Sequence, residues 1–559
     1  MTKNNNTMTK EIASQFDLKA TLRAAFEMQG NKEVIAIWSR KGQRDAYTSA
    51  ELAGMAETIA SELRAWLGEG SHTLVLALPM GIEFIGVMLG AFWADITIVP
   101  VPLPRMGAQS DRFQQIVKDS QASAILCLPR HVELLNSVLR AGSAQPCQVV
   151  PLPLSSSTCA PVLFSRDTTP SAPSLIQYTS GSTRAPKGVR VLGGNIVANS
   201  NLVQRSWGLN QNARVVNWLP HYHDMGLMGG ILYPLLAGGF SAQIDPLDFI
   251  RRPSFWLEVI DAERANFSGG ATFGYSEVLR RVPVEKTRQL DLSCWTNAYC
   301  GAEPVPANLR STFHAHLAAT GFPRDALFAC YGMAEMTLFA AGIRGDAEHH
   351  AKVAPCHLTP ELAQMCAIVD PVSGARLADG QEGEIWLRGP SRAEGYLNQP
   401  NETGTTFGQS LDGQADWLRT GDIGYKTGEA LFVIGRIKDI VICNGRNIAA
   451  PEIEWHACQQ HEALNAMSAA AFAPDPNQSG DAVLIAELHT KNLASQEREH
   501  ICQNIRKTLQ GEMGLNMVDI ILVPRGRLER TSSGKIRRSS VAAAWRADCS
   551  SYTPTDEEV

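Results

Sequence analysis

Residues 178–188 read YTSGSTRAPKG, and this stretch carries most of what the sequence says about the fold. Hydroxyl side chains and glycines lie close together in it, and Lys187 follows close behind. Glycines let backbone N–H groups turn inward around an anion, hydroxyls add neutral donors, and a lysine adds a mobile positive charge. We therefore interpret the segment as a polyphosphate-binding loop. It is not a Walker loop, because the order G-x-x-x-x-G-K-[ST] is absent, and the alternative is a plain Ser/Thr/Gly surface turn.

The segments around this loop alternate between short apolar runs and stretches with helical spacing. Such alternation predicts an α/β fold with a parallel sheet covered by helices on both faces. The predicted strands are residues 72–79, 96–104, 124–129 and 189–192. The predicted helices are residues 49–65, opened by a cap at Ser49, and residues 82–94, 112–122 and 193–207.

The pattern changes in the last third of the chain. Short β-like pieces follow one another from about residue 380, and the final segment mixes strands with helices as a small α+β unit would. The β-like pieces are GEIWLRG (383–389), GEALFVIG (428–435), DIVICNG (439–445), AVLIAEL (482–488) and DIILVP (519–524), and the helices are 497–510 and 539–547. We therefore predict a large N-terminal α/β domain, residues 1–435, and a small C-terminal α+β domain, residues 436–559.

Composition narrows the class of protein. The chain has 559 residues, with 44% hydrophobic and 19% charged residues, as expected for a globular enzyme of more than one domain. The net charge of −6 gives no general reason to bind nucleic acid or an anionic membrane. The polar start lacks the apolar core of a secretion signal, and the apolar run at 82–104 is broken by Asp95 and prolines, too early for a membrane span. With 12 scattered cysteines and no Cys-x-x-Cys pair, we expect a cytoplasmic protein with reduced thiols.

Further motifs follow the phosphate loop in a fixed order. They are GAEPV (301–305), YGMAEMT (331–337), WLRTGD (417–422), GRIKDIV (435–441) with NGRN (444–447), and TSSGKIR (531–537). Together they resemble the adenylate-forming superfamily of acyl-CoA synthetases, luciferases and peptide-synthetase adenylation domains, over residues 30–545. The segment WLPHYHDMGL (218–227) is most similar to stand-alone fatty acyl-AMP ligases. Those enzymes hand an acyl group to the phosphopantetheine arm of a carrier protein.

The resemblance implies a role for each matching residue. The β- and γ-phosphates of ATP would be held by Thr179, Ser180, Gly181, Ser182, Thr183 and Lys187. The adenine would lie against Gly301, Ala302, Glu303, Tyr331, Gly332 and Met333, and the ribose against Asp422 and Arg436. Glu335 would hold Mg²⁺, Thr337 would lie near the α-phosphate, and His223 near the incoming carboxylate. Lys535 would bridge the carboxylate and the α-phosphate, and Lys438 would be the hinge of the small domain.

The implied chemistry suits these residue types. A carboxylate is a poor electrophile, and attack of its oxygen on the α-phosphorus of ATP gives a mixed anhydride and pyrophosphate. Several anionic groups meet in this step, so positive charge and Mg²⁺ are needed. Positioning and electrostatics therefore dominate the protein's contribution.

Two departures from the family pattern leave details open. The stretch between Leu338 and Ile368 is short, in a region that normally carries an extra segment thought to keep coenzyme A chemistry off. SGGATFGYSEVLRR (268–281) replaces the usual Ala-Pro-Asn-Phe-Ala-Tyr pattern beside the acyl tunnel. The acceptor, and the length and shape of the acid, thus stay open at this point.

Four functions compete. The first is a fatty acyl-AMP ligase that feeds a separate acyl carrier protein or a synthase of polyketide or nonribosomal peptide biosynthesis, and the second is an acyl-CoA synthetase. The third is a peptide-synthetase-type domain. It is disfavoured because the segment 217–224 does not show the Asp that those domains use to bind an α-ammonium group. The fourth is a catalytically silent nucleotide-binding protein, disfavoured because Lys535, Glu335 and Asp422 are all present. The histidines at 221, 223, 349, 350 and 357 show no zinc-ligand spacing matched by a second half.

Overall fold

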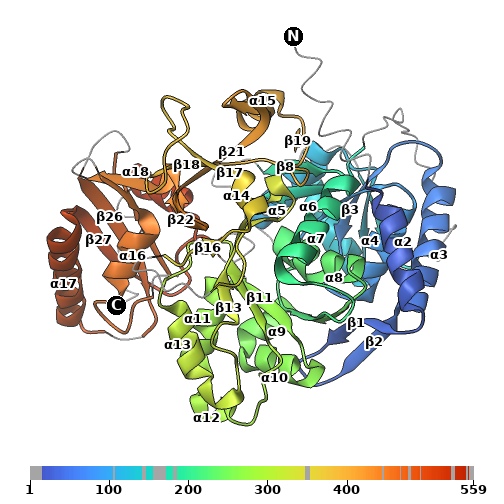
Figure 1. The fold of residues 1–559 in the computed structure, drawn as a ribbon, viewed down its shortest axis with the longest axis horizontal. Helices are drawn as coiled ribbons and strands as arrows, with labels where there is room; N and C mark the ends of the chain where they lie inside the picture. Colours follow the sequence, from blue (N-terminus) through green and yellow to red (C-terminus); the bar gives the residue numbers. More distant parts are fainter. Residues whose placement is uncertain are drawn as a thin grey trace.

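The computed structural model describes residues 16–104, 108–141, 147–154, 172–179, 186–345, 353–443, 446–465, 468–475, 480–490, 493–530, 535–548 and 552. Figure 1 shows two groups of elements, with the C-terminal α16, α17, α18, β26 and β27 together at one end in orange and red. The remaining elements form the larger body. Within the described residues, no helix is both long and apolar enough to span a bilayer.

A mainly parallel sheet carries the phosphate loop. Its order is β19-β8-β7-β4-β3-β5-β6, parallel from β7 to β6 and antiparallel at β8 and β19. The strands are β3 (Thr73–Ala77), β4 (Thr97–Pro100), β5 (Ala124–Cys127), β6 (Gln148–Pro151), β7 (Leu175–Thr179), β8 (Lys187–Val191) and β19 (Gly395–Tyr396). In the sequence, the predicted phosphate loop lies between β7 and β8, and its residues 180–185 are outside the described residues.

This sheet is buried on both faces, as the sequence predicted. Along β3, Leu74 and Leu76 belong to one apolar cluster, whereas Val75 and Ala77 belong to another, because successive side chains of a strand point to opposite faces. The first cluster packs with α2 (Leu18–Gln29), α3 (Ser49–Leu67), α4 (Ile82–Trp93) and α7 (Gly193–Trp207), and the second with α5 (Ala108–Ser120) and α6 (Val132–Arg140).

The predicted cap of the helix that begins at residue 49 was wrong by one position. The N-cap of α3 is Thr48, which forms a capping box with Glu51. Ser49 is buried, and its hydroxyl donates to the backbone carbonyls of Phe26 and Gly30 instead.

A second mainly parallel sheet contributes residues of β9, β11 and β12 to the wall of the cavity. Its order is β13-β12-β11-β9-β10-β1-β2, and only the β1–β2 pair is antiparallel among its described strands. The strands are β1 (Glu33–Trp38), β2 (Arg44–Thr48), β9 (Arg214–Asn217), β10 (Phe240–Ile244), β11 (Phe267–Ala271), β12 (Asn297–Gly301) and β13 (Leu327–Ala329). The helices of this part are α8 (Tyr233–Leu236), α9 (Pro246–Arg251), α10 (Ser254–Glu263), α11 (Thr272–Arg281), α12 (Val284–Thr287) and α13 (Leu309–His316).

An antiparallel sheet of order β16-β22-β21-β18-β17 contains the first two predicted β-like pieces, 383–389 and 428–435. Its strands are β16 (Cys356–His357), β17 (Cys366–Val369), β18 (Gly383–Leu387), β21 (Gln414–Thr427) and β22 (Ala430–Arg436), with β20 (Gln409–Leu411) beside β21. The short pair β14 (Tyr331–Gly332) and β15 (Phe339–Ala341) lies apart from it, and α14 (Pro360–Gln364) and α15 (Pro400–Thr406) complete this part.

The C-terminal elements have their own apolar cores. One cluster runs from Val441 to Leu522 and a second includes Phe472 and Val541, whereas the large cluster of the main body ends at Leu431. The elements are β23 (Ile440–Cys443), β24 (Arg446–Ala449), β25 (Ala469–Phe472), β26 (Asp481–Leu488), β27 (Asn516–Pro524), α16 (Ala450–Cys458), α17 (Ser495–Met513) and α18 (Arg538–Ala547).

Candidate active site

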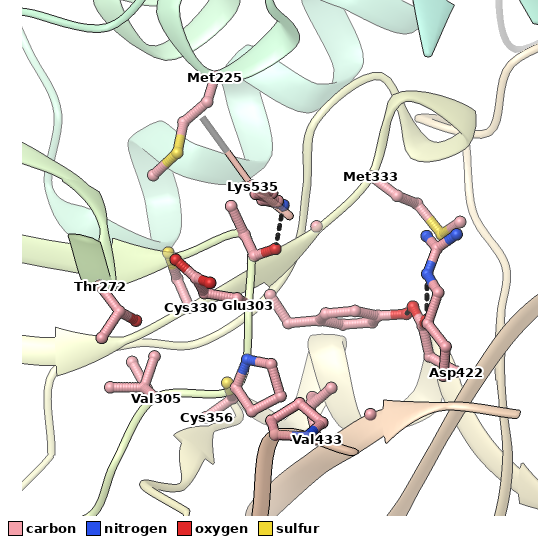
Figure 2. A pocket seen from close by; sticks show the side chains of 18 of the residues that line it. Met225, Thr272, Glu303, Val305, Cys330, Met333, Cys356, Asp422, Val433 and Lys535 are labelled. Carbon is pink, nitrogen blue, oxygen red and sulfur yellow. Dashed lines mark hydrogen bonds and ion pairs between the residues drawn. The ribbon is translucent and has the colours of Figure 1, made fainter. Parts of the chain in front are cut away.

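A cavity of about 890 Å³ lies where the C-terminal elements meet the main body. Its walls combine the loop after β12, the β14 region, β21, β22 and the segment that enters α18. The predicted residues that line it are Thr179, His223, Ala302, Glu303, Tyr331, Gly332, Met333, Glu335, Asp422, Arg436 and Lys535. Figure 2 shows Lys535 and Glu303 near the centre of this cavity and Asp422 to one side.

Other predicted residues lie elsewhere. Gly301, Thr337, Lys187 and Lys438 are not part of the cavity wall. Ser180, Gly181, Ser182 and Thr183 lie outside the described residues. Thr179, the last described residue before them, lines the cavity, and its carbonyl accepts a 2.8 Å hydrogen bond from Arg112 on α5.

One corner of the cavity is built by strand register. Asp422 on β21 and Arg436 on β22 are direct cross-strand partners, so their side chains form an ion pair with a 3.1 Å separation. The hydroxyl of Tyr331 donates to the other oxygen of Asp422 at 2.6 Å. The Asp422 carboxylate raises the pKa of Arg436, and burial together with Asp422 raises the pKa of Tyr331. This corner therefore offers a fixed carboxylate, a fixed ring and a cation.

A second corner is centred on Glu335, in the short turn η4 (Ala334–Met336). Tyr396 donates to its carboxylate at 2.8 Å, and burial raises the pKa of the Glu335 carboxyl although this hydrogen bond lowers it. Among the described residues no Lys or Arg forms an ion pair with Glu335. Lys187 lies over the ring of Tyr396 at 5.3 Å and forms an ion pair with Glu402, so it belongs to the same corner although it does not line the cavity.

Thr337, which the resemblance places near the α-phosphate, belongs to the same turn but does not line the cavity. It is buried, and its hydroxyl donates to the carbonyl of Ser391 at 2.7 Å. Its φ of 67° lies in the left-handed region, as does the φ of 71° at Ala302. Non-glycine residues adopt this region rarely, and strain of this kind concentrates at functional sites.

His223 and Asp224 stand at the start of the π-helix η2 (Met225–Leu232). The two side chains are 2.6 Å apart, and Asp224 also accepts from the backbone N–H of Met225 at 2.7 Å. Burial alone would raise the pKa of Asp224, but His223 and this N–H hold it below its ordinary value. A long π-helix is rare and usually marks a functional site.

Lys535 reaches the cavity from the C-terminal side. Its ammonium donates to the carbonyl of Ala302, a residue 233 positions earlier, as the dashed line beside it in Figure 2 marks. Burial lowers the pKa of Lys535, although the neighbouring Glu303 and Asp224 favour its charged form. Burial raises the pKa of Glu303, whose Oε1 has no hydrogen-bond partner among the described residues. The motifs GAEPV (301–305) and TSSGKIR (531–537) are far apart in sequence, but Ala302 and Lys535 are in contact.

The connection between the two parts of the chain passes through η5 (Ile437–Asp439), where Lys438 is exposed. Beyond it, Arg538 at the start of α18 forms two hydrogen bonds of 2.6 and 2.7 Å with Glu454 on α16. Arg538 also lies 3.8 Å from Asp439. The segment that presents Lys535 is therefore anchored to its own domain core next to the connection.

The far end of the cavity is an apolar arm between α7, η2 and the floor strands β9, β11 and β12. Its walls are Val203, Trp207, Leu209, Val215, Met225, Gly229, Tyr233, Phe267, Tyr299, Leu338 and Phe339. The ring of Trp207 stacks on Tyr299 at 5.1 Å and meets Phe339 edge-on at 5.1 Å. An arm of this composition accepts an aliphatic or aromatic group rather than a charged one.

Sequence reasoning missed some residues of the site. Tyr396 lies in the stretch AEGYLNQP (393–400), and nothing in the sequence pattern indicated that its hydroxyl would donate to Glu335. Arg112 falls in the predicted helix 112–122, and no motif marks it. Trp207 and Tyr299 come from a helix end and a strand, and only tertiary packing brings them together.

Fold and site together define a nucleotide-type site with an apolar side arm, closed by a lysine from a small C-terminal part. The chain belongs to the AMP-binding enzyme family, whose profile matches residues 22–397. The resemblance seen in the motifs is thus confirmed, and with it the class of ligase enzymes that use ATP and the α/β fold.

Named relatives and a solved structure are similar to this chain over nearly its whole length. The chain is 31% identical to the medium-chain-fatty-acid–[acyl-carrier-protein] ligase JamA of Moorena producens, over 92% of this chain and 91% of JamA. It is 30% identical to the long-chain-fatty-acid–AMP ligase FadD26 of Mycobacterium marinum, over 91% and 92% of the two chains. A structure from a study of fatty acyl-adenylate ligases of E. coli and L. pneumophila superposes with a TM-score of 0.81 at 26% identity, covering 96% of this chain and 98% of that one.

Proposed function

We propose that this protein joins a fatty acid to AMP, releasing pyrophosphate, and then passes the acyl group to the phosphopantetheine thiol of an acyl carrier protein. The observation that carries the proposal is the meeting, in one cavity, of Lys535, the Glu335 and Asp422 carboxylates, and an apolar arm. The names of JamA and FadD26 support the fatty acid, and that of JamA supports the carrier protein. Domains of residues 1–435 and 436–559 fit the separate apolar cores.

In the first step a carboxylate oxygen of the acid attacks the α-phosphorus of ATP. The new O–P bond forms as the bond to the β-phosphate bridging oxygen breaks, and pyrophosphate leaves with that electron pair. Lys535 is the group we assign to the meeting point of carboxylate and α-phosphate, because an ammonium offsets negative charge that gathers there. His223, oriented by Asp224, borders the path of the carboxylate.

The nucleotide is held by groups that already have fixed geometry. Asp422 accepts both ribose hydroxyls in this proposal, and Arg436 and Tyr331 hold its carboxylate in place. Tyr331, Gly332 and Met333 with Ala302 and Glu303 border the adenine, and Gly301 ends the strand that positions Ala302 and Glu303. Residues 179–183 with Lys187 hold the β- and γ-phosphates, and Thr337 acts by fixing the backbone of the turn that carries Glu335.

Glu335 fits a Mg²⁺ ligand. Its carboxylate is desolvated, as the raised pKa reflects, and it lacks an ion pair with Lys or Arg among the described residues, so a hard cation compensates it well. Mg²⁺ bound there supplies positive charge that stabilises the phosphate oxygens. Tyr396 orients the carboxylate with its 2.8 Å hydrogen bond.

In the second step a thiol attacks the acyl carbonyl and AMP leaves. Lys438, at the connection, is the proposed hinge for the movement of residues 436–559 between the two steps. The short stretch between Leu338 and Ile368 keeps an acyl-CoA synthetase as the second candidate, since the extra segment that this region normally carries in the family is thought to keep coenzyme A chemistry off.

ATP–pyrophosphate exchange with a panel of saturated acids tests the first step. We expect exchange that depends on a fatty acid, and its absence with every acid would overturn the proposal. Incubation with ATP, acid and either coenzyme A or a phosphopantetheinylated carrier protein tests the second step. Formation of the acyl-carrier protein in one incubation, and accumulation of acyl-adenylate in the other, which contains coenzyme A, support the ligase. Rapid formation of acyl-CoA supports the second candidate.

A further inference from the structure

The apolar arm follows the strands β9, β11 and β12 from their carboxyl ends toward their amino ends. These strands are parallel, so their carboxyl ends lie at one edge of the sheet. Thr272 and Ala302, the first residues after β11 and β12, line the cavity at that edge, where Lys535 donates to the carbonyl of Ala302. Phe267, the first residue of β11, lines the same cavity at the opposite edge. The arm therefore extends along the whole length of β11.

Strand register shows which face of the sheet borders the arm. Phe267 is the register partner of Val215 on β9, and both line the cavity. Tyr299 on β12, which also lines it, is the partner of Gly269, two residues after Phe267. Residues at intervals of two point to the same face of a strand, so these wall residues belong to one face.

The helical side of the arm follows the same path. Met225, Gly229 and Tyr233 line the cavity at intervals of four residues along η2 and into α8, so they share one side of the helix. Figure 2 shows Met225 and Thr272 on the side of the cavity away from Asp422. The arm thus leads from Lys535 away from the polar corner and into the main body.

The length of β11 gives the length of the arm. Phe267 lies five residues before Thr272, which corresponds to about 16 Å along a strand. An extended aliphatic chain advances about 1.3 Å per carbon, because its C–C bonds of about 1.5 Å form a zigzag. With the carboxylate beside Lys535, at the level of Thr272, the arm holds a chain of about ten to twelve carbons.

Leu209 closes the inner end of the arm. It lies in the turn between α7 and β9 and lines the cavity. Its side chain is buried, at 5% exposure, whereas residues 208 and 210–212 on either side of it are exposed. Leu209 therefore turns inward from a surface turn, close to the start of β9, and a chain longer than the arm would meet it.

We propose that the acid is of medium length, about ten to twelve carbons, and that Leu209 sets its upper limit. The inference rests on the proposed function and names the length of the acid within it. A shorter acid leaves part of the apolar wall without contact, so it gains less from burial. A longer acid has no room for its last methylenes unless Leu209 moves.

The test measures kcat/KM in ATP–pyrophosphate exchange for even-numbered saturated acids from six to eighteen carbons. We expect a maximum at ten or twelve carbons, and a value for the sixteen-carbon acid lower by at least about tenfold, the scale of a misfitting methylene. A maximum at eight carbons or fewer, or at fourteen or more, would overturn the inference. Absence of exchange with every acid would overturn the proposed function and this inference with it.

Leu209→Ala tests the end wall. We expect kcat/KM for the sixteen-carbon acid to rise about tenfold relative to the ten-carbon acid, with KM for ATP unchanged. Leu67→Ala is the matched control, because Leu67 ends α3, is also 5% exposed and does not line the cavity. Leu209→Val trims the same side chain by less, so it should fold if the alanine variant does not and should give a smaller shift in the same direction. An unchanged length profile in the folded variant would contradict the inference.

Discussion

The two ends of the cavity are organised by different forces. At the polar end, Tyr331, Asp422 and Arg436 bind one another within the protein, and Glu335 is oriented by Tyr396. At the apolar end, shape is set by the stacking of Trp207 on Tyr299 and by the absence of a side chain at Gly269, where a Cβ would meet the ring of Tyr299. The difference teaches that the polar end is preorganised by hydrogen bonds, which suits the constant nucleotide proposed for it. The apolar end, proposed for the acid, is defined by packing, which a few side-chain changes can alter.

The largest effect is expected where the two ends meet. Lys535→Ala removes the cation assigned to the α-phosphate and carboxylate, and the rate of adenylation should fall by on the order of 10²–10³. ATP binding, measured by calorimetry, should persist, because the residues of the polar end remain. Lys507→Ala, at an exposed site on α17, is the control. A loss of less than tenfold, or a parallel loss of ATP binding, would contradict the assignment.

The next effect separates the polar end from the arm. Asp422→Asn removes the charge that pairs with Arg436 and is assigned to the ribose, so KM for ATP should rise about 10–100-fold, the range for hydrogen bonds to charged groups. The order of preference among acids should not change. Asp412→Asn, which affects an exposed pair with Arg376, should leave KM for ATP nearly unaltered. A changed acid preference in Asp422→Asn would show that the two ends are coupled.

The next variant, Gly229→Ala, adds a methyl group to the apolar wall of the cavity and tests the apolar end rather than the polar end. Gly229 on η2 lines the cavity, and a Cβ there would meet only Leu338 Cδ2, at 3.4 Å, within 4 Å. Gly229→Ala should fold and should reduce kcat/KM for long acids relative to short ones by about tenfold, the scale of one misplaced methyl group. KM for ATP should stay the same, and Gly54→Ala on α3 is the helix control. An equal loss with all acid lengths would argue that the acyl chain does not pass Gly229.

The smallest effect concerns Glu303, at the border between the ends. Burial raises the pKa of this carboxyl above 4.5, so the folded state favours its neutral form. The resulting stability is present below pH 4.5 and is lost as pH rises through the folded pKa. Glu303→Gln should therefore have a higher Tm than wild type at pH 7, with a difference that shrinks toward pH 4.5. Glu499→Gln on the exposed face of α17 should show no such trend, and a lower Tm of Glu303→Gln at pH 7 would mean that Lys535 outweighs the burial.

The sequence by itself determined the class of fold and the polar half of the site. Apolar runs and helical spacing predicted the parallel sheet, because these patterns follow from how strands and helices bury one face. The residues Tyr331, Asp422 and Lys535 were predicted because the motifs that carry them resemble those of the adenylate-forming superfamily. Asp422 and Arg436 form an ion pair because the hairpin of β21 and β22 places them directly opposite each other.

Only the tertiary structure decided the rest. The partner of Glu335, Tyr396, lies 61 positions away, and the stack of Trp207 on Tyr299 joins a helix end to a strand. The hydroxyl of Thr337 donates to the carbonyl of Ser391, 54 positions away, and its φ is 67°; its motif revealed neither feature. Such contacts depend on how separate elements pack in space, and local pattern carries no information about them.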